Sequence, residues 1–355
     1  MKKRNAIVVT AGYLSTPNGK TAHGLIRHSD RYNIVGIIDN EHAGKDAGEM
    51  LDGKKNNIPI FSSISDFINN SPLNAEFCIV GVATKGGVIP KNLRGILVEA
   101  LENKMNLVNG LHEYISDDNQ LAKLASDSGL EIIDIRRPKK IKDLHFWTGR
   151  IAEVRCPKIA VLGTDCALGK RTSTQLLVEA TKKAGYKSEM IYTGQTGWMQ
   201  GAKYGFIFDS TLNDFVSGEM EHAVFQCWQE VKPDIMFVEG QSSLRNPSGP
   251  AGSEWLVSLE ATAVVLQHDP VRERYKDMEF YPVNIPTPKD EINLIKQYGV
   301  PTIALLLNTS KVTKEKARHF AAQYHDELGI QVILPLIDGV DALIPVLKEL
   351  INKSK

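Results

Sequence analysis

Ile159-Ala-Val-Leu-Gly-Thr-Asp-Cys-Ala-Leu-Gly-Lys-Arg-Thr-Ser-Thr174 is the stretch that decides the fold of this chain. An apolar run typical of a buried strand leads into a loop bounded by Gly163 and Gly169, and a helical pattern begins at Lys170. This order predicts a phosphate-binding P-loop, where backbone N–H groups, a helix N-terminus and a lysine converge on a polyphosphate. The plainer alternative is a glycine-rich turn without a ligand. The agreement of strand, loop, lysine and helix favours the P-loop.

The loop departs from the usual P-loop motif in two places. Five residues rather than four separate Gly163 from Gly169, and Arg171 stands where a Ser or Thr normally follows the lysine. The nearest hydroxyl belongs to Thr172, and one further helical residue turns a side chain by about 100°. We therefore expect an intact phosphate cradle and a displaced Mg²⁺-binding hydroxyl.

The bulk composition excludes several classes of protein. A chain of 355 residues predicts two domains, and 42 basic residues balance 42 acidic ones, so neither a nucleic acid nor a membrane surface is indicated as a partner. The apolar run at 6–9 is too short for a signal-peptide core, and the four cysteines form no Cys-x-x-Cys pair. We expect a cytoplasmic protein.

Short β-branched runs alternate with helical stretches along the whole chain, which predicts an α/β fold with mainly parallel sheets. We expect strands at 6–9, 34–38, 77–82, 106–108 and 131–135, and then at 159–162, 188–192, 235–238, 263–266, 302–307 and 332–334. The charged stretch Arg136-Arg-Pro-Lys-Lys140 is typical of a linker. It divides the chain into a Rossmann-like domain, residues 1–140, and a P-loop NTPase-like domain, residues 141–355. Asp39 follows the second strand as in dinucleotide-binding folds, but the first turn lacks G-x-G-x-x-G, so a Rossmann-like scaffold without NAD is favoured.

Several polar residues follow predicted strands of the second domain, where α/β sheets place their ligands. Glu239 could act as a general base or hold Mg²⁺, or it could simply end its strand. His268 could act in acid–base chemistry, although single histidines are more often structural. Arg245 could clamp a carboxylate or form a surface ion pair, and Asn308 could read an adenine edge or serve only as a turn residue.

Two family resemblances rest on these motifs. Gly163-Thr-Asp165, Gly169-Lys170, Val238-Glu-Gly240 and Asn308 resemble dethiobiotin synthetase, an ATP-dependent enzyme, but that family carries Thr at the position of Arg171. A closer resemblance covers nearly the whole chain. Phe146-Trp-Thr-Gly149, Gly163–Thr172, Thr193-Gly-Gln-Thr-Gly197, Asn213-Asp-Phe-Val-Ser-Gly-Glu219, Glu239-Gly-Gln-Ser-Ser-Leu244 and Gly44-Lys-Asp-Ala-Gly-Glu49 are similar to a two-domain family that includes DgcN-type D-glutamate N-acetyltransferases.

This resemblance implies transfer of an acetyl group from acetyl-CoA to the amino group of D-glutamate, with a separate racemase or epimerase acting on the product. It also implies a homo-oligomer with a small acidic amino acid as its substrate. We assign catalysis to Glu239 and His268 and no residue to a metal. The expected coenzyme-binding residues are Gly163, Thr164, Asp165, Cys166, Ala167, Leu168, Gly169, Lys170, Arg171, Thr172 and Asn308. The expected substrate-binding residues are Gln195, Thr196, Asp214, Glu219, Gln241, Ser242 and Arg245.

Two other functions stay open on sequence grounds. The P-loop, Glu239 and Asn308 also suit an ATP-dependent ligase or kinase that uses Mg²⁺, but the displaced hydroxyl argues against it. A nucleotide sensor without catalysis is the third possibility, which the polar, glycine-rich loops around the P-loop disfavour.

Overall fold

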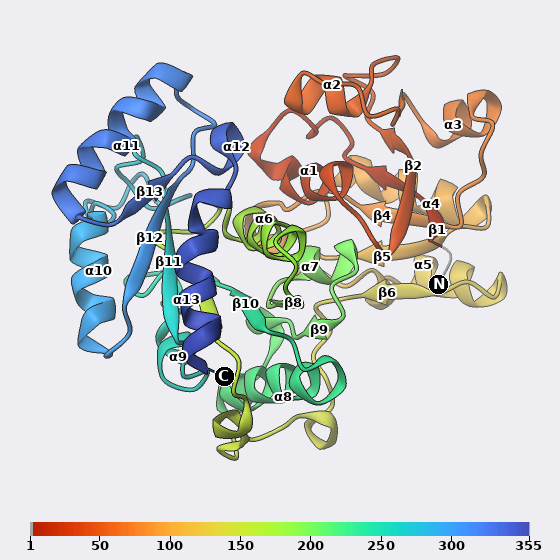
Figure 1. Cartoon of the computed structure of the whole chain (residues 1–355). Coiled ribbons are helices and arrows are strands. Elements are labelled where there is room, and N and C mark those ends of the chain that lie inside the picture. Colours follow the sequence, from red (N-terminus) through yellow and green to blue (C-terminus); the bar gives the residue numbers. More distant parts are fainter. Residues whose placement is uncertain (1–2, 355) are drawn as a thin grey trace. The chain divides into compact units, whose positions relative to one another are not determined.

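The computed structural model describes residues 3–354 and divides into two α/β units, each with its own sheet (Figure 1). Unit 1 contains the chain up to Pro138 together with Gln195–Ala202, and unit 2 contains Lys139–Gly194 and the chain from Lys203 onward. Every strand pairing between named strands in both sheets is parallel, which confirms the predicted α/β class. Within residues 3–354, no helix combines the length and the apolar character that crossing a membrane requires.

The sheet of unit 1 has the strand order β3-β2-β1-β4-β5-β6, which is the Rossmann order. Its strands are β1 (Arg4–Val9), β2 (Tyr32–Ile38), β3 (Ile60–Phe61), β4 (Phe77–Val80), β5 (Asn106–Asn109) and β6 (Ile132–Asp134). Its helices are α1 (Lys20–Arg27), α2 (Ala47–Asp52), α3 (Ile64–Asn70), α4 (Lys91–Glu102), α5 (Asn119–Asp127) and α7 (Gln195–Gln200). Two apolar clusters, one with residues of α1 and α2 and one with residues of α3, α4 and α5, form the core of this unit.

Asp39, at the end of β2, fastens the first βα turn of unit 1. Its buried carboxylate accepts hydrogen bonds from Thr10 Oγ1 at 2.7 Å, from the backbone N of Gly12 at 3.0 Å and from His42 Nδ1 at 2.8 Å. Burial alone would raise the pKa of Asp39, but these hydrogen bonds outweigh it and lower the pKa. Asp39, the residue that would bind the ribose in a dinucleotide-binding fold, therefore forms its hydrogen bonds within the protein.

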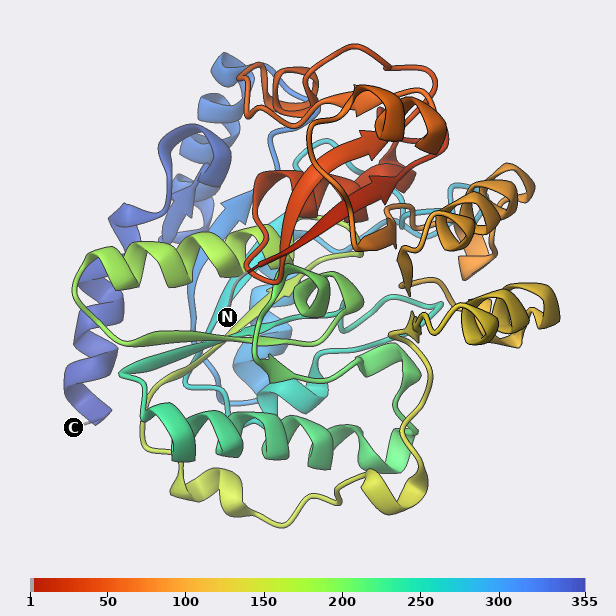
Figure 2. The same ribbon diagram turned by 90° about the vertical axis from the view of Figure 1, so that its right-hand side faces the viewer.

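The sheet of unit 2 has the strand order β13-β12-β11-β7-β10-β8-β9. Its strands are β7 (Lys158–Gly163), β8 (Ser188–Tyr192), β9 (Tyr204–Gly205), β10 (Ile235–Glu239), β11 (Ala263–His268), β12 (Thr302–Leu307) and β13 (Gln331–Ile333). Its helices are α6 (Lys170–Lys183), α8 (Asn213–Val231), α9 (Ser253–Leu256), α10 (Pro288–Gln297), α11 (Lys314–Leu328), α12 (Pro335–Asp338) and α13 (Ile344–Ser354). Figure 2 shows α6 and α8 on opposite sides of the strands, so β7 is covered on both faces.

All the predicted strands are present, with ends that shift by up to two residues. The prediction missed β3 and β9, which have two residues each and are too short for a periodic pattern.

Helix α7 belongs to unit 1 although strands of unit 2 precede and follow it in the sequence. Met199 is fully buried in the core of unit 1, and Gln200 Nε2 donates to the backbone oxygen of Gly24 at 2.8 Å. Arg31 lies over the ring of Trp198, with 4.0 Å between its guanidinium carbon and the ring centroid. The division at residue 140 stays a prediction, and nothing in the sequence signalled that this helix packs with the first unit.

Candidate active site

The P-loop connects β7 to α6 and has the backbone that a phosphate cradle needs. Gly169 adopts φ 105°, which favours glycine, and Ala167 adopts φ 51°, which is uncommon for a residue with a side chain. A Cβ atom on Gly163 would lie 3.3 Å from Cδ of Lys170, so glycine leaves room for the lysine stem. The backbone of the loop and the space beside Gly163 therefore allow the side chain of Lys170, the first residue of α6, to fold back along the P-loop.

Lys170 ties the P-loop to the loop that follows β10. Its buried Nζ donates to the backbone oxygens of Asp165 and Ser242, both at 2.7 Å. Burial lowers the pKa of this lysine, although the charges of Cys166 and Asp165 oppose that shift. The ammonium is held among carbonyl oxygens at the base of the loop.

Asp165 anchors a further loop onto the P-loop. This fully buried carboxylate pairs with Arg272 NH1 at 2.9 Å and accepts from the backbone N of Lys276 at 2.8 Å and from Asn246 Nδ2 at 3.0 Å. Arg272 NH1 also donates to the backbone oxygen of Cys166 at 2.7 Å. The segment after β11 is thereby fixed against the phosphate cradle, which the sequence did not indicate.

Glu239 ends β10, the strand beside β7, and its side chain is buried. The backbone N of Thr193 donates to Oε2 of Glu239 at 3.1 Å, and Thr193 Oγ1 donates to the backbone oxygen of Glu239 at 2.8 Å. Burial raises the pKa of Glu239, and the positive charge of Arg171 opposes that rise. A carboxylate whose pKa moves toward neutrality is suited to a general base.

Ser242 and Gln241 lie in the loop that follows Glu239. Ser242 adopts φ 38°, a strained backbone conformation for a residue with a side chain, and strain of this kind gathers at functional sites. Its hydroxyl lies 3.5 Å from Sγ of the partly buried Cys166, and its carbonyl receives the Lys170 ammonium. Gln241 Nε2 donates to Thr193 Oγ1 at 3.1 Å. The structure therefore brings Glu239, Gln241 and Ser242 together with the P-loop.

His268 ends β11 beside the P-loop and is buried. Its Nδ1 lies 2.9 Å from Oγ1 of Thr164 and its Nε2 lies 3.2 Å from the hydroxyl of Tyr324. Burial lowers its pKa to about 4, with a further contribution from the charge of Arg272. The imidazole is therefore neutral at pH 7, and both of its nitrogens face protein hydroxyls.

Asn308 and Arg245 have partners within the protein. Asn308 Nδ2 donates to the backbone oxygen of Leu168 at 2.9 Å, while its Oδ1 accepts from the backbone N of Ser310 at 3.0 Å. The NH2 of Arg245 lies 2.9 Å from Oε2 of the buried Glu291. Burial raises the pKa of Glu291, and Arg245 opposes the rise. Adenine recognition by Asn308 and carboxylate recognition by Arg245 stay predictions.

Glu219 and Asp214 lie on α8. Glu219 is buried and fastens the segment before β7, because it pairs with Lys139 and accepts from Nδ1 of His145 at 2.8 Å and from its backbone N at 2.9 Å. Asp214 is exposed in the first turn of α8. The family motifs around Phe146 and Asn213 are in contact, because the ring centroids of Phe146 and Phe215 lie 4.4 Å apart.

Gln195 and Thr196 lie on α7 in unit 1, where Gln195 Oε1 accepts from Arg136 NH2 at 2.7 Å. The substrate-binding roles of Gln195, Thr196, Asp214 and Glu219 stay predictions.

Sequence reasoning missed Arg272, Asn246 and Tyr324. Arg272 follows β11 and Asn246 follows β10, so the rule that ligands bind beyond the carboxyl ends of strands could have drawn attention to both. Tyr324 lies on α11, and its approach to His268 has no signal in the sequence.

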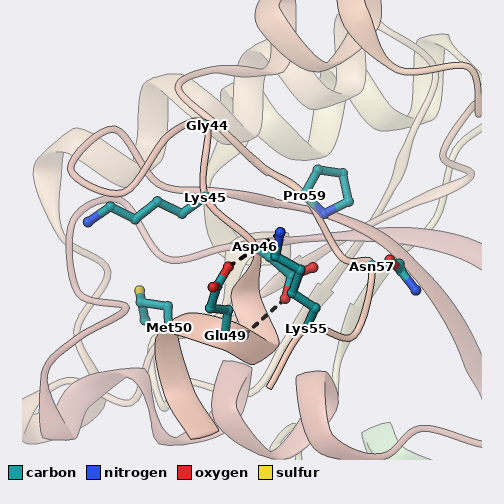
Figure 3. Close-up of a pocket in the computed structure, with 8 residues that line it drawn as sticks. All are labelled: Gly44, Lys45, Asp46, Glu49, Met50, Lys55, Asn57 and Pro59. Carbon is teal, nitrogen blue, oxygen red and sulfur yellow. Dashed lines mark hydrogen bonds and ion pairs between the residues drawn. The ribbon is translucent and has the colours of Figure 1, made fainter. Parts of the chain in front are cut away.

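A cavity of about 750 Å³ in unit 1 surrounds the motif that begins at Gly44 (Figure 3). Asp46 caps α2, because its Oδ1 accepts from the backbone N of Glu49 at 2.9 Å, and Lys55 Nζ lies 3.9 Å from Oε2 of Glu49. Asp46 of this family motif therefore caps α2, and Glu49 pairs with Lys55 in the lining of the cavity.

The side chains around the P-loop fit a divalent cation poorly. Mg²⁺ in P-loop enzymes is held by the hydroxyl after the lysine and by an acid at the end of a neighbouring strand. Here Arg171 stands at the position of that hydroxyl, its positive charge opposes the rise in the pKa of Glu239, and Asp165 is already paired with Arg272.

Comparison with known families identifies the chain. The model described as "Domain of unknown function (DUF1611_C) P-loop domain" matches residues 145–344, and the model described as "Domain of unknown function (DUF1611_N) Rossmann-like domain" matches residues 40–138. The chain belongs to the DUF1611 family. These matches confirm the predicted Rossmann-like and P-loop architecture.

Relatives of the chain include two curated proteins and one solved structure. A D-glutamate N-acetyltransferase from Pseudoalteromonas sp is 28% identical over 279 residues, which cover 77% of this chain and 81% of that protein. A D-glutamate N-acetyltransferase from Tritonibacter scottomollicae is 27% identical over 290 residues, with the same coverages of 77% and 81%. The crystal structure of a DUF1611 family protein from Anabaena variabilis ATCC 29413 matches with a TM-score of 0.87 at 28% identity, covering 97% of this chain and 99% of that chain. The predicted family resemblance is confirmed.

Proposed function

We propose that this protein is an acyltransferase that moves the acetyl group of acetyl-CoA to the amino group of D-glutamate. The names of the two curated relatives support the reaction and the acceptor. The observation that carries the proposal within this chain is the buried carboxylate of Glu239 at the carboxyl end of β10, the strand beside β7, which leads into the P-loop.

The reaction requires a base beside a phosphate site. The amino nitrogen attacks the thioester carbonyl carbon, a C–N bond forms, and the C–S bond breaks with departure of the CoA thiolate. The nitrogen must lose a proton, which Glu239 takes up, and a carboxylate with a raised pKa suits that transfer near neutral pH. The pyrophosphate of CoA lies against the amides of the P-loop and Lys170 in this proposal.

Replacing Glu239 with Gln tests the role of the base. The amide keeps the shape of the side chain and removes the proton acceptor, so we expect kcat to fall by about 10²- to 10⁴-fold with little change in the affinity for acetyl-CoA. Glu179→Gln is the matched control, because this glutamate is exposed on α6, and it should leave kcat unchanged. Near wild-type turnover of Glu239→Gln across the pH range would exclude Glu239 and leave His268 and Asp269 as the groups to test.

The acceptor is tested by comparing kcat/KM for D-glutamate, L-glutamate, D-glutamine and D-alanine. We expect D-glutamate to be preferred, because a site that pairs a cation with the second carboxylate leaves that cation unpaired with a neutral substrate. Arg245 is the proposed cation, so the acceptor carboxylate must compete with Glu291 for its guanidinium group. Arg245→Lys should therefore reduce the preference for D-glutamate over neutral amino acids. Equal rates with D-alanine and D-glutamate in the wild type would refute the acidic acceptor. Turnover that consumes ATP would favour the ligase.

A further inference from the structure

Unit 2 also has a cavity, of about 490 Å³, lined by residues that follow the carboxyl ends of β11 and β12. One wall is Val271, which directly follows β11, and the other is formed by the turn after β12 and the first turns of α11. Neither the family motifs nor the residues assigned above include the side chains of this cavity.

Two connections place the cavity beside the phosphate cradle. Arg272, the neighbour of Val271, donates to Asp165 and to the backbone oxygen of Cys166. On the other wall, Asn308 Nδ2 donates to the backbone oxygen of Leu168, and its backbone N donates to the oxygen of His268 at 2.7 Å. Both walls are therefore anchored to the P-loop within a few residues of the cavity lining.

The lining combines apolar surface with positive charge. Val271, Val312 and Phe320 provide the apolar part, which suits the face of a purine. The basic part comes from Lys311, Lys316 and His319.

The basic groups of the cavity are only partly compensated. Lys311 Nζ lies 3.9 Å from Oδ2 of Asp269, an acid that Arg272 Nε also approaches at 3.5 Å, and Lys316 is exposed on α11. An apolar wall with two lysines beside a pyrophosphate cradle matches an adenosine that carries an additional phosphate.

We propose that this cavity binds the 3′-phosphorylated adenosine of coenzyme A, with Lys311 and Lys316 holding the 3′-phosphate. In coenzyme A a single ribose separates that phosphate from the pyrophosphate, so the two groups require neighbouring sites. Asn308 then acts as a positioning residue, because its amide fixes the turn that carries Lys311 against the P-loop. This inference rests on the proposed use of acetyl-CoA and adds the part of the chain that distinguishes coenzyme A from ATP.

The test compares the dissociation constants of coenzyme A and 3′-dephospho-coenzyme A, measured by calorimetry at one fixed ionic strength. We expect the wild type to bind coenzyme A about ten- to a hundredfold more tightly, as the loss of a charged hydrogen bond predicts. Lys316→Ala and Lys311→Ala should each reduce this ratio. Lys314→Ala is the matched control, because this lysine is exposed in the first turn of α11 and does not line the cavity, and it should leave the ratio unchanged.

Equal affinities in the wild type, or a ratio that neither lysine variant changes, would overturn the inference. Failure of the cavity proposal can be distinguished from failure of the proposed acetyl transfer. A ratio that depends on both lysines, in a protein that acetylates no acidic amino acid, would support the cavity and reject only the proposed reaction. Binding of ATP without binding of either coenzyme would reject both.

Discussion

Protonation of His268 should make unit 2 sensitive to acid. Its imidazole is buried, and its pKa is lowered from 6.5 to about 4, so the folded protein binds this proton less readily than the unfolded chain. The contribution of neutral His268 to the free energy of unfolding is therefore complete above pH 6.5, and it is lost progressively as the pH falls from 6.5 through 4.

The size of the effect follows from these two pKa values. At about 1.4 kcal/mol for each pH unit, the complete loss amounts to roughly 3 kcal/mol, of which about 2 kcal/mol is reached at pH 5. This is a large part of the stability of an ordinary domain, which is about 5–15 kcal/mol.

The assay is urea unfolding of the wild type and of His268→Gln at pH 7.5 and pH 5, followed by circular dichroism and by tryptophan fluorescence. We expect the free energy of unfolding to fall by about 2 kcal/mol more in the wild type than in the variant. His222, which stacks on His145 and whose pKa is lowered by burial and by that neighbour, is present in both proteins, so its contribution cancels. Equal losses in the two proteins would refute the assignment of acid sensitivity to His268.

Three further results are expected. Lys170→Ala should weaken acetyl-CoA binding by about ten- to a hundredfold in calorimetry, because a cation is removed from the pyrophosphate, and an unchanged affinity would separate the P-loop from the coenzyme. Acetyl transfer should persist in excess EDTA because Arg171 displaces the hydroxyl that a nucleotide-bound Mg²⁺ requires, and loss of activity that Mg²⁺ restores would contradict this. Gly218→Ala should lower the free energy of unfolding by about 1–3 kcal/mol or more in urea titrations, because its Cβ would collide with the backbone oxygen of His145, and an unchanged midpoint would argue against this tight packing.

The fold could be predicted because its signals are local. Each long strand is an apolar run, and the glycines and lysine of the P-loop lie within one short segment. The alternation of strand and helix patterns and the spacing of the P-loop residues therefore suffice to predict the two-domain α/β fold. The packing of α7 with unit 1 could not be predicted in this way. It depends on Met199 and Gln200 meeting residues more than a hundred positions earlier in the chain.

The candidate site was predictable only in part, for the same physical reason. The places of Glu239 and His268 beyond the sheet could be predicted because each ends an apolar strand, while their catalytic roles stay predictions. The partners of predicted residues were not found, because an ion pair such as Asp165 with Arg272 joins positions that no periodicity connects. The pairing of Arg245 with Glu291 likewise gives a proposed substrate ligand a partner that sequence alone did not reveal.

The distribution of charge around the P-loop favours binding of a phosphate ester over its hydrolysis. A hydrolytic P-loop leaves its acids available to a metal ion, which then bridges the terminal phosphates. In this chain Asp165 pairs with Arg272 and accepts from two further donors, and the positive charge of Arg171 opposes the rise in the pKa of Glu239. This arrangement suits the proposed acyl donor, whose pyrophosphate is held and not cleaved.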